Sequence, residues 1–138
     1  VATFLSLRSV FQKARVYHLV TQAAETSLDR ITFEIESARS VATTTSIFDT
    51  NPGVLMLAND TLTREVSMVG GALHIKENGV DAGPLTPPGV TVQNLVFTYY
   101  ENARTQAVRV LITLHAESGA ASTTRTFRTL SIPRNSYE

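Results

Sequence analysis

Three histidines are the side chains of this sequence best suited to metal binding. They are His18, His74 and His115, and the chain has no cysteine. A zinc site would therefore need at least two of them, together with carboxylates, at one point in space. His18 falls in a segment with helical periodicity, and the other two fall in separate segments with strand character. We interpret all three as polar residues on half-exposed faces, and the sequence predicts no metal site.

Other catalytic patterns are missing from the sequence as well. It contains no Gly-x-Ser-x-Gly elbow, no His-Glu-x-x-His helix and no phosphate-binding glycine loop. Glu34 and Glu36 lie two residues apart on a predicted helix and face different directions, so they are not a general acid/base pair. Asn78 and Asp81 offer oxygen ligands for calcium, but the needs of a tight turn account for both. We expect no enzymatic activity and no cofactor.

Arginines give the chain its one charge asymmetry. Between residues 104 and 134, Glu117 is the only acid. Arg109 and Arg128 are predicted to share the outer face of paired strands, as a patch for DNA, an acidic polysaccharide or a neighbouring subunit's carboxylates. The alternative is a solvated sheet face. The candidate patch consists of Arg104, Arg109, Arg128 and Arg134, and Arg125 belongs to the same arginine-rich stretch.

Nucleic acid is disfavoured as a ligand of this patch. Phe127 is out of phase with Arg128 and is predicted to lie in the core, so the aromatic that single-strand binding needs is missing from the arginine face. The whole chain also balances 12 basic against 12 acidic residues, which leaves no global field to attract a polyanion. Its 138 residues, 43% hydrophobic and 17% charged, are typical of one folded domain.

A long amphipathic helix is predicted over about residues 1–41. Residues of one face recur at steps of three and four, and the β-branched run from Val41 ends the pattern. A helix from Leu7 to Ser40 would measure roughly 50 Å, longer than a small domain is wide, so its front end should project. The predicted covered stripe is Val10, Ala14, Tyr17, Thr21, Ala24, Leu28, Ile31, Ile35 and Ala38. The predicted solvated face carries Glu25, Asp29, Arg30, Glu34, Glu36 and Arg39, with ion pairs at Arg30–Glu34 and Glu36–Arg39.

The projecting front of this helix is apolar before and after its first charge at Arg8. A short protruding helix cannot bury such residues within its own domain, so we expect them to contact partners. The alternatives are packing on the domain's own sheet and fraying of a chain end. The predicted partner-binding face consists of Phe4, Leu7, Val10, Phe11, Ala14 and Tyr17.

Strands follow the helix over about residues 54–133. Asn78-Gly79 is a strong two-residue hairpin signal, and the segment from Gly83 to Gly89 is predicted to be an unpaired loop. Along residues 108–116 apolar and mixed positions alternate, as in a sheet covered on one side. The predicted strands are 54–58, 62–69, 73–77, 90–100, 106–116 and 122–132. The fold predicted for residues 1–138 is a single α+β domain, a long helix packed on an antiparallel meander.

Three segments resemble the type IV pilin-like superfamily, in particular minor pilins and the J-type pseudopilins of type II secretion. They are the helical residues 12–39, the run Leu85-Thr86-Pro87-Pro88-Gly89-Val90 with the strand through Tyr100, and the closing stretch 107–135. The resemblance implies a structural subunit, of the minor kind, whose helix packs beside those of other pilin or pseudopilin subunits. It also implies a cell-surface or periplasmic location after anchoring in the inner membrane.

The chain begins with Val1 rather than methionine, and we interpret it as a truncated product whose missing upstream segment would be the membrane anchor. Pilus and pseudopilus remain equally open. A different class of function remains open too, a cell-surface binding module for a glycan, DNA or protein with no role in a filament.

Overall fold

The computed structural model describes residues 2–134 and shows one long helix followed by eight strands. The elements are α1 (Ala2–Ser37), β1 (Ser40–Val41), β2 (Leu55–Ala58), β3 (Thr63–Val69), β4 (Ala72–Glu77), β5 (Val80–Pro84), β6 (Val90–Glu101), β7 (Gln106–Ser118) and β8 (Ala121–Ser131). The predicted α+β class is confirmed. The helix ends at Ser37, slightly before the predicted position near residue 41.

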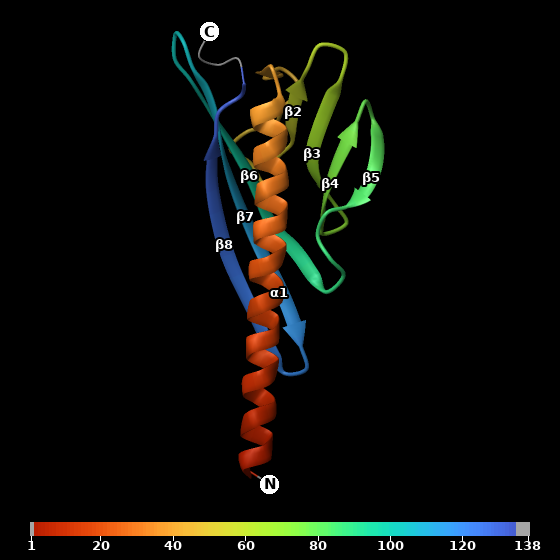
Figure 1. The fold of residues 1–138 in the computed structure, drawn as a ribbon, viewed down its shortest axis with the longest axis vertical. Coiled ribbons are helices and arrows are strands. Elements are labelled where there is room, and N and C mark those ends of the chain that lie inside the picture. Colours follow the sequence, from red (N-terminus) through yellow and green to blue (C-terminus); the bar gives the residue numbers. More distant parts are fainter. Residues whose placement is uncertain (1, 135–138) are drawn as a thin grey trace.

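The strands form two antiparallel sheets, each with its strands in sequence order, instead of the single antiparallel meander that the sequence predicts. One sheet has the order β1-β2-β3-β4-β5 and the other β6-β7-β8. The helix packs along one face of the three-stranded sheet, and the five-stranded sheet lies beside the C-terminal half of the helix (Figure 1). Below, the front of α1 means residues 2–15 and the rear means residues 16–37. The sheets separate after β5, because β6 pairs with the following strand β7 instead of the preceding one.

Loop backbone joins the two sheets along the free edge of β6. The amides of Asp49 and Gly53 donate hydrogen bonds to the carbonyls of Phe97 and Leu95, each at 2.8 Å. Farther along the same edge the amide of Val92 donates to the carbonyl of Gly71, also at 2.8 Å. These bonds satisfy backbone groups that an open edge strand would expose.

Strand β5 corrects a second prediction, that residues from Gly83 onward cannot pair. It lies at a sheet edge, and His74 of β4 is opposite Pro84, with a register shift between His74 and Lys76. Proline is tolerated at an edge because its missing N–H faces away from the ladder. The predicted hairpin turn is confirmed, since Asn78 and Gly79 both have positive φ, 50° and 84°.

The core lies between α1 and the inner faces of both sheets, and it includes Leu55, Val66 and Leu73 of the five-stranded sheet. Val108, Val110, Ile112, Leu114 and Ala116 are all buried, which confirms the predicted alternation of β7. They meet the rear of the helix, where the side chains of Ile31 and Ile35 are 0% exposed. Burying aliphatic side chains of this size contributes about 1.5–3 kcal/mol each.

The covered stripe of the front half of α1 differs from the predicted one. Val10, Ala14 and Tyr17 are exposed, and Thr21 is only half-buried. Ala24 is buried as predicted, and the other buried residues in this part of the helix are Val16, Val20 and Ala23. The helix offers apolar side chains on both sides here, and the position of the sheet decides which of them are covered.

Candidate functional site

The front of α1 presents apolar side chains to solvent. The exposed fractions are 53% for Leu7, 61% for Val10, 72% for Phe11 and 52% for Tyr17. Ala14 is exposed as well, and the side chain of Phe4 lies outside the described residues. The predicted face is therefore exposed over its described part. Large apolar residues exposed together are typical of an interaction surface.

The end of the three-stranded sheet explains the exposure of Leu7, Val10 and Phe11. The β7–β8 turn approaches the helix so closely that a Cβ added at Gly119 would lie 2.5 Å from Nε2 of Gln12. Helix residues 2–11 extend past this turn, by about 15 Å at 1.5 Å per residue (Figure 1). Beside the turn, Leu7, Phe11 and Ser118 line a mainly apolar groove together with Arg8, Gln12 and Arg15.

The side chain of Arg125 marks where the free part of the helix ends. Its guanidinium lies 4.6 Å from the ring centre of Tyr17 and 5.1 Å from that of Phe127. Its Nη1 also donates to Oγ1 of Thr21 at 3.2 Å. Arg125 therefore faces the helix rather than the outer surface of the sheet, and it fixes the helix to β8 through cation–π contacts.

Only two of the four arginines of the candidate basic patch come together. Arg109 is opposite Leu130, two residues from Arg128 on the neighbouring strand, so the two are diagonal neighbours on the outer face. Both are exposed. Arg104 belongs to the turn between β6 and β7, and Arg134 lies beyond β8, where its amide donates to the carbonyl of Ala38.

The prediction that this outer face lacks an aromatic is wrong. Tyr100 of β6 is opposite Ala107, which lies two residues before Arg109, and its side chain is 46% exposed. Tyr100 is thus a diagonal neighbour of Arg109 on the same face. Phe127 is partly buried against the core, as predicted. The tyrosine could have been found in the sequence from the alternation of residues 97–100.

Glu34 is the one charged residue among the buried polar side chains of the described chain, which corrects its predicted place on the solvated face. Its Oε1 accepts a hydrogen bond from Nε of Arg30 at 2.8 Å, the predicted pair, and its Oε2 accepts one from Nη1 of Arg64 on β3. Arg64 is also 3.7 Å from Glu77. The bond to Glu34 raises the pKa of Arg64 above its ordinary value.

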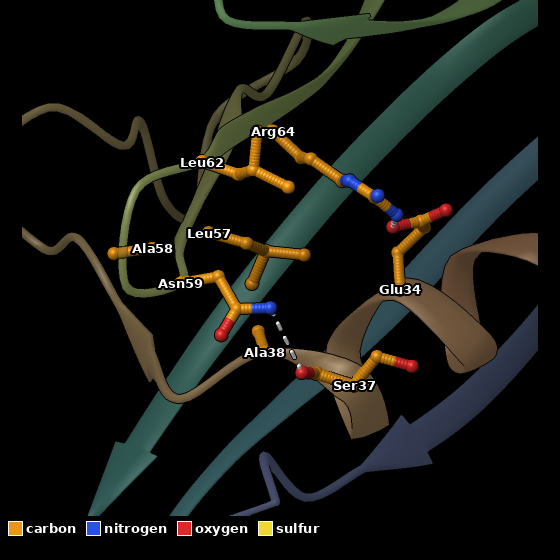
Figure 2. A pocket seen from close by; sticks show the side chains of 8 residues that line it. All are labelled: Glu34, Ser37, Ala38, Leu57, Ala58, Asn59, Leu62 and Arg64. Atoms are coloured by element: carbon orange, nitrogen blue, oxygen red, sulfur yellow. Dashed lines mark hydrogen bonds and ion pairs between the residues drawn. The ribbon is translucent and has the colours of Figure 1, made fainter.

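This ion network holds α1 against the five-stranded sheet. Figure 2 shows Arg64 reaching from β3 to Glu34 on the helix, and Nδ2 of Asn59 donating to the carbonyl of Ser37 at 3.4 Å. The free space between these residues is only about 10 Å³, room for no more than one water. The cluster is therefore a structural contact. The predicted pair Glu36–Arg39 is wrong, since Arg39 pairs with Asp60 at 2.8 Å.

The three histidines lie on three different elements, α1, β4 and β7. His18 is exposed on the helix, and Nδ1 of His74 contacts Oδ2 of Asp81 at 2.8 Å. His115 contacts Thr124 and Glu117 at 2.7 and 3.0 Å. Within residues 2–134 no group of three or more histidine or acidic side chains is placed to hold a metal ion.

The oxygens of the hairpin are used within the fold. Oδ1 of Asn78 accepts from the amide of Thr63, and Oδ1 of Asp81 accepts from the amide of Gly83 at 2.8 Å. The contact with His74, and then this amide bond, lower the pKa of Asp81 below its ordinary value. The hairpin geometry therefore accounts for both side chains.

Comparisons of the chain with protein-family models, with curated proteins and with solved structures find no match. In the described part of the chain, no helix combines the length and the apolar composition that crossing a bilayer requires.

Proposed function

We propose that this chain is a structural subunit of a type IV pilus or type II secretion pseudopilus, and that it assembles through the front of α1. One observation carries the proposal: the same helix is covered by the sheet from Val16 onward and bare where Leu7, Val10 and Phe11 lie. Such a surface suits a partner helix, because burying these side chains would contribute about 1.5–3 kcal/mol each.

The proposed location follows from this role. The subunit would be anchored in the inner membrane by a segment upstream of Val1 and would reach the periplasm or cell surface on assembly. Its partners would be other pilin or pseudopilin subunits, packed helix against helix, with the sheets outside. The role includes no catalytic step.

Two measurements test this proposal. The coding sequence upstream of Val1 should specify about twenty apolar residues, enough to span a membrane. The full-length protein should copurify with sheared surface filaments or with the secretion complex, and Phe11→Asp should abolish that copurification. Val80→Asp on β5 is the matched control, since Val80 is 71% exposed and Phe11 is 72% exposed. A start codon immediately before Val1, or a Phe11→Asp protein that still copurifies, would contradict the proposal.

A surface binding module is the second candidate, and the row of Tyr100, Arg109 and Arg128 on successive strands of the outer face favours it. An aromatic beside one cation, with a second cation on the next strand, suits an acidic glycan or a single-stranded nucleic acid. If this candidate is correct, the isolated chain should bind a polyanion in a screen of glycans and oligonucleotides. Arg109→Ala and Arg128→Ala should each weaken that binding, whereas the control Arg104→Ala should not.

A further inference from the structure

Strand β8 is a free edge of the three-stranded sheet, and it is long and regular (Figure 1). It covers Ala121–Ser131, contains no proline or lysine, and pairs with β7 without a register shift. Within residues 2–134, no loop backbone bonds to its outer side. The other edges are protected, since β6 bonds to Asp49, Gly53 and Gly71, β1 has only two residues, and β5 has a register shift and ends at Pro84. A long unprotected edge is a template for pairing with another chain.

The β7–β8 turn shows which backbone groups of β8 point away from β7. Ser118 is opposite Ala121, so the turn has two residues, and the first of them, Gly119, has a φ of 62°. Such a turn closes on a hydrogen-bonded pair, after which non-hydrogen-bonded and hydrogen-bonded pairs alternate. The hydroxyl of Thr126 lies 2.9 Å from that of Thr113, as expected of a closer, non-hydrogen-bonded pair. The residues whose N–H and C=O point outward are therefore Ser122, Thr124, Thr126, Arg128 and Leu130.

One flank of α1 lies over this edge. Nη1 of Arg125 on β8 donates to Oγ1 of Thr21 at 3.2 Å. Oγ of Ser131, the last residue of β8, donates to Oγ1 of Thr32 at 3.3 Å. Leu28 is seven residues after Thr21 and four before Thr32, so it faces the same way, and it is only half-buried. A further strand about 4.8 Å beyond β8 would place every second side chain beneath this flank and cover Leu28.

The charge of β8 indicates the kind of strand that fits. Its only charged residues are Arg125, which faces α1, and Arg128 on the outer face, and neither belongs to an ion pair within residues 2–134. Pairing of β8 with β8 of a second copy would bring these cations together without a carboxylate on either strand. Charges on an edge strand act against self-pairing in this way, and they favour a strand of the opposite charge.

We infer that β8 binds an extended, acidic segment of a partner protein as an antiparallel fourth strand of the β6-β7-β8 sheet. The segment places a carboxylate beside Arg128 on the outer face and apolar side chains against Leu28 and the exposed ring of Tyr17 on the inner face. Backbone hydrogen bonds supply affinity, and alternate side chains supply specificity. The inference goes beyond the filament proposal, because it uses a different surface and holds whether or not the front of α1 assembles.

A synthetic peptide of about ten residues, blocked at both ends, tests strand addition. Valine alternates in it with threonine or glutamate, so that one face is apolar and the other acidic. Opposite residues of an antiparallel pair share a face and a hydrogen-bonding state, so the amides of threonine and glutamate should bond to β8. N-methylation at those positions should abolish the binding that fluorescence anisotropy measures, whereas N-methylation at the valines should leave it unchanged.

Variants of β8 locate the site. Thr126→Pro removes one outward N–H and keeps the pairing with β7, because proline is tolerated where the N–H faces away from the ladder. It should weaken peptide binding roughly tenfold, through one lost hydrogen bond and an unpaired carbonyl. Thr126→Val loses the same hydroxyl but keeps the amide, so it is the matched control and should bind like the wild type. Arg128→Glu should weaken binding of the acidic peptide several-fold at low salt and strengthen binding of a peptide with lysine in place of glutamate.

Amide hydrogen exchange gives a readout that a folding defect would not imitate. With the peptide bound, the outward amides of Thr124, Thr126 and Arg128 should exchange more slowly, while the inward amides, which are bonded to β7, should change little.

Three results would overturn the inference. A wild-type chain that does not bind the peptide is the first. The second is binding that ignores N-methylation and Thr126→Pro, since the peptide would then be held by the outer face of the sheet instead of its edge. The third is self-association in sedimentation that Thr126→Pro abolishes, because β8 would then pair with β8 of a second copy.

Discussion

The front and rear of α1 have similar apolar residues in opposite surroundings. Ile31 and Ile35 are fully buried on the sheet, whereas Leu7 and Phe11 are more than half exposed. The difference arises outside the helix, because the three-stranded sheet ends where its β7–β8 turn meets Gln12. An amphipathic pattern therefore shows that a face will be covered, and the rest of the fold decides whether the chain itself covers it.

The largest expected effect separates the two regions by stability. Ile31→Ala should lower the free energy of unfolding by about 3 kcal/mol, since it removes a fully buried side chain and leaves a cavity. Phe11→Ala removes a larger side chain but should change stability by less than about 0.5 kcal/mol, because that residue contacts mostly solvent. Urea unfolding monitored by circular dichroism measures both. Similar losses for the two variants would show that the front is buried too.

A smaller effect is expected for the ion network at the rear. Glu34→Ala should lower the free energy of unfolding by about 2 kcal/mol, because it removes the carboxylate that pairs with the guanidinium groups of Arg30 and Arg64. The figure is below that of a fully buried pair because both arginines are partly in solvent, 50% and 28% exposed. Glu36→Ala, two residues along and exposed, is the control and should be near neutral in thermal denaturation. Equal effects would place Glu34 in solvent.

The smallest effect concerns the boundary between the two regions. Arg125→Ala should lower the free energy of unfolding by about 1 kcal/mol, because it removes the cation–π contacts with Tyr17 and Phe127. Arg128→Ala on the outer face should change that free energy by less than about 0.5 kcal/mol. Chemical denaturation of the two variants in parallel distinguishes them. A neutral Arg125→Ala would mean that the sheet does not fix the helix at Tyr17.

Local patterns were enough to predict the elements that depend on them. The alternation from Val108 to Ala116 predicts the buried face of β7, and Asn78-Gly79 predicts the turn between β4 and β5, because both features are set by neighbours in the sequence. The long helix and the free face around Leu7 and Phe11 follow from periodicity and length alone.

Features that depend on distant partners were not predictable in this way. Helical periodicity placed Glu34 among solvated charges, because its partner Arg64 lies thirty residues away on another element. The division into two sheets depends on backbone bonds from Asp49 and Gly53 to β6, which have no side-chain signature. The sheet packs against Val16 and Val20 and leaves Ala14 and Tyr17 exposed, and the helical pattern alone does not show which of the two sides the sheet will cover.

Hydrogen exchange along α1, in the free chain and in assembled filaments, tests the central claim most directly. In the free chain, amides before Gln12 should exchange at least about 100-fold faster than those of residues 20–35, because only the rear is held by tertiary packing. On assembly the front amides should become protected while the rear changes little. Uniform protection of the free helix, or a front that exchanges equally fast in the filament, would contradict a helix whose front is completed by a neighbouring subunit.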